Sequence, residues 1–131
     1  MTSVSQIHDF IQKEQLNDDL LIVLDIDNTV MKMNKNFGSD QWFNWQSGLL
    51  GTSDQSSLVI SFDELLELQN VIFNLSHMSP VEEGTKSFIE GFQKQKIPLV
   101  ALTSRGPSMR SNTLRELNRA QIDFSHTAIK G

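Results

Sequence analysis

Two aspartates one residue apart follow directly on an apolar run near the start of the chain. Leu20–Leu24 is an unbroken aliphatic stretch, and Asp25 and Asp27 come at its end, followed by Asn28 and Thr29. An aliphatic run of this length predicts a strand that is buried on both faces, as in a parallel sheet. Two acids at such a strand end reach one small site, where one acts as a nucleophile and the other moves a proton or helps to hold a metal. A solvated turn is the alternative, because Asp and Asn are common turn residues.

The rest of the chain predicts the elements that would position these acids. Apolar residues recur at helical spacing in several segments, and a second apolar run at 97–102 reads as a strand. The expected helices are 4–16, 39–45, 62–75, 81–94 and 107–120, and the expected strands are 20–25 and 97–102. Ile122, Phe124 and residues 125–129 suggest a third strand or the approach to one. Pro80 is placed to open the helix that follows it. This order of strands and helices predicts an α/β sandwich.

The two strand ends carry a family resemblance. The stretch from Asp25 to Val30 is similar to the first motif of the haloacid dehalogenase (HAD) superfamily, Asp-x-Asp-x-(Thr/Val). Thr103, which ends the second apolar run, matches the Thr or Ser of that family's second motif. The sequence of residues 102–105, Leu-Thr-Ser-Arg, also resembles that of HAD-like acid phosphatases and of an uncharacterised bacterial family close to them. The resemblance covers roughly residues 18 to 124 and implies a HAD-like, Rossmann-like parallel sheet.

That resemblance also implies a chemistry. Asp25 would attack phosphorus and carry the phosphoryl group, and Asp27 would protonate the leaving oxygen and then activate water. Mg²⁺ would bind the Asp25 carboxylate and the backbone carbonyl of Asp27. Thr29 would brace the loop, and Thr103, with Ser104 beside it, would contact the phosphate, although a Thr there is also a common helix cap. The function implied is Mg²⁺-dependent hydrolysis of a small phosphorylated substrate.

Arg105 has two interpretations of its own. It follows Thr103 closely enough to pair with a phosphorylated substrate. A surface ion pair is the other reading of an arginine in this place.

The resemblance also implies a cap between the two motifs and two further motifs after them. Residues 31–80 would be a mainly helical cap inserted between the two motifs, within one domain of 1–131. The acidic pair that completes Mg²⁺ coordination is missing after Asp123, and Lys130 is the only candidate for the motif lysine. We therefore expect an N-terminal portion of a longer protein, with three core strands, that is inactive or nearly so alone. An exposed edge at Leu20–Leu24 would favour self-association.

Composition limits the partners. The 131 residues carry a net charge of −5, with 38% hydrophobic and 21% charged residues, which suits one globular domain. The acidic balance argues against nucleic acid and against an anionic membrane surface. Cysteine is absent, so disulfides and thiolate chemistry are excluded. With no apolar signal-peptide core, the expected location is the cytoplasm, although a specialised secretion system would leave no readable signal.

Two other functions compete with a phosphatase. A catalytically dead scaffold or interaction module would explain the missing acidic pair and the exposed edge. A phospho-receiver-like domain also gathers acids, a Thr and a Lys, but its phosphorylated Asp follows a later strand, whereas Asp25 and Asp27 share one strand end.

Overall fold

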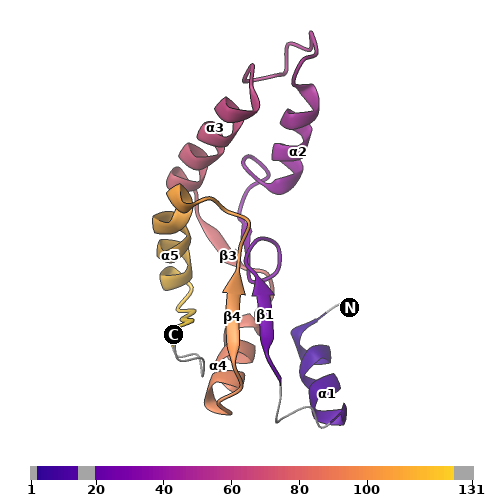
Figure 1. Cartoon of the computed structure of the whole chain (residues 1–131), viewed down its shortest axis with the longest axis vertical. Helices are drawn as coiled ribbons and strands as arrows, with labels where there is room; N and C mark the ends of the chain where they lie inside the picture. The colour runs from indigo at the N-terminus through magenta and orange to yellow at the C-terminus, as the bar shows by residue number, and fades with distance from the viewer. Residues whose placement is uncertain (1–2, 15–19, 126–131) are drawn as a thin grey trace.

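The protein is a mixed α/β chain of short strands and five α-helices in its described part. A computed structural model describes residues 3–14 and 20–125. In chain order the elements are α1 (Val4–Glu14), β1 (Ile22–Asp25), β2 (Met31–Met33), α2 (Asp40–Leu49), α3 (Phe62–Leu75), β3 (Met78–Pro80), α4 (Thr85–Lys94), β4 (Leu99–Leu102), the 3₁₀ turn η1 (Pro107–Met109) and α5 (Arg110–Arg119) (Figure 1).

The four strands of the described residues form two separate pairs. β1 and β4 are parallel, with Ile22 opposite Leu99 and Asp25 opposite Leu102. β2 and β3 pair antiparallel, and in the chain they lie before and after the segment that contains α2 and α3. In the described part of the chain the parallel sheet therefore has two strands, where three were predicted. Of the predicted third strand, Ile122, Phe124 and Ser125 are not in a strand, and residues 126–129 lie outside the described residues.

The parallel pair has one covered face. Ile22 and Leu99 are buried in the core that α1, α4 and α5 complete, and Figure 1 shows α4 behind the two strands. Successive side chains of a strand point to opposite faces. On the face away from the core, Val23 and Leu102 keep 50% and 66% of their surface exposed. The predicted mixed α/β class is confirmed, but in the described residues the strand is buried on one face and not on both. Asp25 lies on the exposed face.

Residues 31–80 form an elongated arm, which we call the helical arm. β2 and β3 make its stem, and α2 and α3 run away from the parallel strands in Figure 1. Ser39 and Ser61 cap the two helices by accepting hydrogen bonds from the amides of Trp42 and Glu64. Phe43 and Phe62 pack edge to face across the helices, with ring centroids 5.9 Å apart.

The loop that leads into α2 is held tightly against α3. The buried Gln69 side chain donates to the carbonyl of Gly38 at 2.8 Å. Gly38 has φ = +83°, and a Cβ there would lie 2.3 Å from Cγ2 of Ile72. Glycine is thus required at this position by both backbone conformation and space.

The stem strands were not predicted, and they shift the start of the next helix. Pro80 pairs with Met31 in the stem and does not open a helix. The chain continues with the Val81 amide donating to the Val30 carbonyl at 3.1 Å, and α4 begins only at Thr85. The prediction of a helix from residue 81 is therefore wrong by about one turn.

Side chains of α5 anchor the base of α3, in a group that we call the Glu116 clamp (His77, Arg115, Glu116 and Arg119). Arg115 donates to the carbonyls of Phe73, Asn74 and Ser76 at 2.7–3.0 Å. These carbonyls lie at the end of α3, where no later turn of the helix supplies N–H donors. Glu116 is buried and accepts from the Met78 amide at 3.0 Å and from Arg115 Nε at 2.8 Å. The clamp therefore fixes one leg of the helical arm to the core.

Candidate functional site

The carboxyl ends of β1 and β4 bring the two predicted motif residues to one edge. Asp25 is the last residue of β1, and its register partner is Leu102. Thr103 follows Leu102 directly, so its backbone leaves the sheet beside that of Asp25. The side chain of Asp25 is exposed, whereas Thr103 is half-buried. This is the edge at which open α/β sheets bind ligands.

The chain turns sharply after Asp25. The Ile26 carbonyl accepts hydrogen bonds from the amides of Val30 and Met31 at 3.0 and 2.9 Å, and from that of Thr29 at 3.4 Å. Asn28 sits in the left-handed region with φ = 57°, a conformation that Asn tolerates better than most residues. The side chain of Thr29 is exposed, and the bracing role expected of Thr29 stays a prediction.

Asp27 is held by Arg105. Nε of Arg105 donates to Oδ2 of Asp27 at 2.8 Å and Nη2 donates to Oδ1 at 2.5 Å, so both carboxylate oxygens accept from one guanidinium. The side chains are only 5% and 19% exposed, respectively for Arg105 and Asp27. Of the two predicted interpretations, an ion pair is the arrangement present. It is largely buried, however, and links residues 78 positions apart.

Thr103 and Ser104 lie beside this pair. Oγ1 of Thr103 accepts a hydrogen bond from the amide of Arg105 at 3.1 Å, which is a local turn of the kind that Thr often makes. The hydroxyl proton of Thr103 is not used by that bond. Ser104 is exposed. Contacts of either hydroxyl with a phosphate stay predictions.

Asp40 is a third carboxylate near the site, and the sequence analysis did not select it. It is the first residue of α2, and Asn28 donates its side-chain N–H to it. Burial, and then the negative charges of Asp27 and Asp25, raise the pKa of Asp40 above its ordinary value, against the opposing effects of Arg105 and Asn28. In the sequence Asp40 reads as the acidic first-turn residue of a capped helix, and only the turn at Asn28 brings it toward the strand end.

The described residues do not by themselves complete a metal site. In residues 3–14 and 20–125 there is no group of three His, Cys, Asp or Glu side chains arranged to hold a metal ion. Asp25 offers one exposed carboxylate, but both oxygens of Asp27 already face Arg105. Lys130, the candidate motif lysine, lies outside the described residues.

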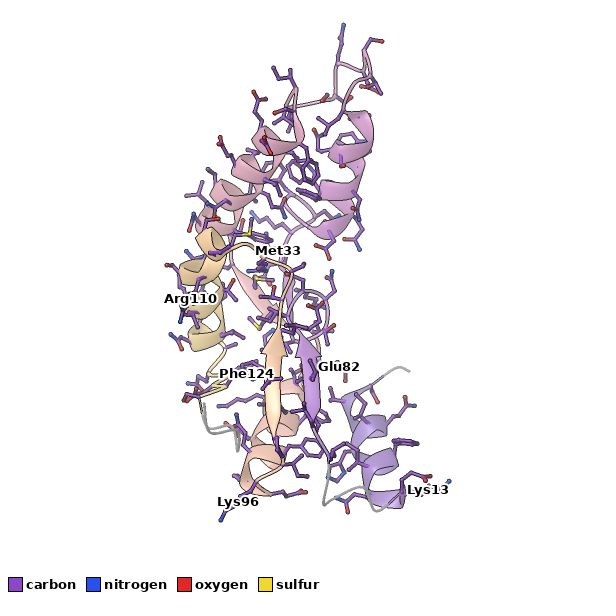
Figure 2. The ribbon with its side chains drawn as sticks, viewed as in Figure 1. Lys13, Met33, Glu82, Lys96, Arg110 and Phe124 are labelled. Carbon is purple, nitrogen blue, oxygen red and sulfur yellow. The ribbon has the colours of Figure 1, made fainter. Side chains whose placement is uncertain are left out.

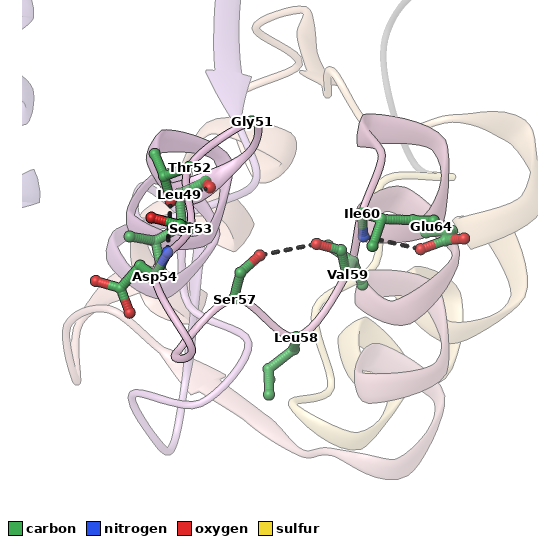
Figure 3. Close-up of a pocket in the computed structure, with 10 residues that line it drawn as sticks. All are labelled: Leu49, Gly51, Thr52, Ser53, Asp54, Ser57, Leu58, Val59, Ile60 and Glu64. Carbon is green, nitrogen blue, oxygen red and sulfur yellow. Dashed lines mark hydrogen bonds between the residues drawn. The ribbon is translucent and has the colours of Figure 1, made fainter.

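Two hollows lie in different places relative to the strand ends. One of about 420 Å³ lies between β4 and α5, beside the site, and is lined by Thr103, Arg105 and Arg110 among others. Phe124 lines its far end, between α5 and β4 (Figure 2). The other, of about 580 Å³, lies in the loop between α2 and α3 (Figure 3), at the end of the arm away from Asp25. The first of these two hollows is the nearer to the strand ends, and a further hollow of about 260 Å³ is lined by Leu24, Asn28 and Thr29 on the other side of β1 from Thr103.

Comparison with known families identifies the chain. All of residues 1–131 match the family described as "Protein of unknown function (DUF2608)", and the chain belongs to that family. Membership of the HAD superfamily, expected from the two motifs, is therefore wrong, since this is the family that matches and no HAD-like family does. The expectation depended on two short stretches, and an acid pair after a strand can arise without common descent. No curated protein matches the chain, and no solved structure does.

None of the described helices has both the length and the apolar character that a membrane crossing requires.

Proposed function

We propose that this site hydrolyses phosphate monoesters through an aspartyl-phosphate, with Asp25 as the nucleophile. The observation that carries the proposal is the parallel register of β1 and β4, in which exposed Asp25 lies opposite Leu102, the residue before half-buried Thr103. In this proposal Thr103 donates its hydroxyl to a phosphoryl group on Asp25. Nearby Asp27 and Asp40 supply carboxylates for proton transfer.

The reaction has two balanced steps. An oxygen of Asp25 attacks phosphorus while the bond from phosphorus to the leaving oxygen breaks, and that oxygen takes a proton from Asp27. Water then attacks the phosphoryl group, Asp27 accepts a proton from the water, and phosphate leaves with the Asp25 carboxylate restored. To donate its proton, Asp27 has to release one oxygen from Arg105, because both oxygens accept hydrogen bonds in the structure.

The proposal keeps Mg²⁺ as the cofactor, held by the Asp25 carboxylate and the Asp27 carbonyl. Oxygen ligands of this kind suit Mg²⁺, which usually retains several waters. The described residues fit it only in part, because they contain no group of three such side chains. No step above depends on the ion.

The finer architecture is also part of the proposal. We propose that β1 and β4 belong to a Rossmann-like parallel sheet, and that the helical arm serves as a cap for the site. The support for a cap is the contact between Asn28 beside Asp25 and Asp40 at the start of α2. A small phosphorylated molecule is the substrate, and the arm would influence which one is accepted.

A non-catalytic scaffold is the second candidate function. It is favoured by the exposed sheet face with Val23 and Leu102, because parallel sheets are normally covered on both sides. A second copy of the chain or another protein would cover this face. This reading expects self-association without turnover.

The deciding experiment assays the 131-residue chain with an aryl phosphate and excess Mg²⁺, and tests acid-stable trapping of one phosphoryl group by mass spectrometry. We expect slow turnover and trapping that Asp25→Asn abolishes. The control is Asp9→Asn, a carboxylate that is 84% exposed on α1 and should change neither result. Turnover that survives Asp25→Asn would refute the mechanism. A folded chain with neither turnover nor trapping would favour the scaffold.

A further inference from the structure

The guanidinium of Arg105 is occupied on every side. Beyond the two bonds to Asp27, Nη1 donates to Oγ1 of Thr113 at 2.9 Å and Nη2 lies 3.2 Å from the sulfur of Met78. The guanidinium carbon lies 4.1 Å from the centre of the Phe73 ring, within the range of a cation–π contact. A guanidinium has five N–H donors, and four of these N–H groups already contact Asp27, Thr113 or Met78, so one N–H is left for a ligand.

The partners of Arg105 come from four different segments. Asp27 follows β1, Phe73 lies in α3, Met78 begins β3, and Thr113 lies in α5. Thr113 is itself buried and donates to the Met109 carbonyl at 2.8 Å, which fixes the acceptor that Nη1 uses. Arg105 is therefore enclosed by the core and by the base of the helical arm.

We propose that Arg105 is a positioning residue, which orients Asp27 and ties it to the base of the helical arm, and that it does not bind the phosphoryl group. The bidentate pair fixes the plane of the Asp27 carboxylate, a geometry that only the planar fork of arginine provides. Phe73 and Met78 hold that fork from the arm. Binding a phosphate with Arg105 would require a side chain that is 5% exposed to give up both bonds to Asp27. The effect of Arg105 on turnover rests on the proposed function, but its contact with Asp27 does not.

The contact is tested first without any activity. In the full chain, ¹⁵N NMR should show a slowly exchanging Nε–H signal for Arg105, because that hydrogen is bonded to a largely buried carboxylate. Asp27→Asn should shift this signal or speed its exchange at least several-fold, and Asp9→Asn should leave it unchanged. Titration with inorganic phosphate or orthovanadate should not move it, whereas signals of the Asp25 loop should move if the anion binds there. A missing slow signal, or one that phosphate shifts in a saturable way, would overturn the proposal.

The consequence for turnover is tested separately. Arg105→Lys keeps the charge and loses the fork, and we expect kcat to fall by about 10- to 100-fold with KM little changed, since misplacing a catalytic group by a small distance has effects of this size. Asp9→Asn is again the control and should leave kcat and KM unchanged, because Asp9 is 84% exposed on α1 and lines none of the three hollows. Thr113→Val removes one support of Arg105 and should give a smaller loss of kcat if Arg105→Lys does not fold.

The results separate the two proposals. A raised KM with unchanged kcat in Arg105→Lys would mean that Arg105 binds substrate, and would overturn the positioning role. If the wild-type chain shows no Asp25-dependent turnover, the proposed function fails, and the NMR result alone decides the role of Arg105.

Discussion

Replacing Glu116 with Gln tests how firmly the Glu116 clamp holds the helical arm. The side chain of Glu116 is 3% exposed and accepts from the Met78 amide at 3.0 Å and from Arg115 Nε at 2.8 Å. Gln keeps the shape but turns one acceptor oxygen into a donor NH₂ group, which then faces an N–H. One charge-assisted hydrogen bond is lost, at a cost of about 1.5–3 kcal/mol.

The other partners add little to this figure. Arg119 is half exposed, so solvent screens its ion pair with Glu116, and its contribution is small. We therefore expect Glu116→Gln to lower the free energy of unfolding by roughly 2–3 kcal/mol at pH 7, a large part of the usual stability of a small domain. The control is Glu90→Gln, because Glu90 makes only an exposed pair with Lys86 at 3.8 Å and should cost less than about 0.5 kcal/mol.

The same variant has a defined pH dependence. Burial alone would raise the pKa of Glu116, but hydrogen bonds from the Met78 amide and from Arg115 outweigh it, and the pKa lies below its ordinary value of 4.5. A lowered pKa means that the stabilisation is present above pH 4.5 and is lost as the pH falls through the folded-state pKa. Urea unfolding at pH 7 and at lower pH measures both effects. A loss below about 0.5 kcal/mol at pH 7, or a difference between wild type and variant that does not shrink in acid, would refute the reasoning.

Two further predictions concern the base of the arm. Gly38→Ala should lower the free energy of unfolding by about 1–2 kcal/mol from the positive φ alone, and the contact of the new Cβ with Ile72 should lower it further. The control is Gly91→Ala, which should be neutral or stabilising because no atom lies within 4 Å of the added Cβ. Equal unfolding midpoints for wild type and Gly38→Ala would contradict this prediction. The free energy of unfolding of Asp40→Asn should increase relative to that of the wild type as the pH rises above 3.8. The pKa of Asp40 is raised in the folded chain, so the stability that Asp40 contributes is present below pH 3.8 and is lost as the pH rises through the folded-state pKa. Since Asp40 is exposed, the gain should stay below about 1 kcal/mol, and a gain that is largest in acid would show the opposite sign.

Local sequence signals located the helices well. α3 has the predicted bounds, because Ser61 caps it and its apolar residues repeat at helical spacing. α2 begins where predicted, after Ser39, but continues to Leu49, four residues beyond the predicted end. β2 and β3 were missed because strands of three residues are too short to show alternation, and because Pro80 also fits the start of a helix.

The site was predictable only where strand ends define it. Asp25 and Thr103 were expected at one edge from two apolar runs, and the parallel register of β1 and β4 agrees with that placement. The pair of Asp27 with Arg105 was only one of two readings, since residues 78 positions apart leave no local signal of their contact. Asp40 was not selected, because its proximity to Asp25 and Asp27 depends on the turn at Asn28.

By itself, the sequence determined the elements whose residues interact over a few positions: the capped helices, the apolar strands, and the acids and threonine that end those strands. The tertiary structure decided which face of the parallel pair is buried, how the stem closes the helical arm, and which partner each charged side chain takes. The physical reason is the range of the interactions. Hydrogen bonds within a helix and hydrophobic periodicity are set locally, whereas the enclosure of Arg105 and Glu116 exists only after distant segments have packed together.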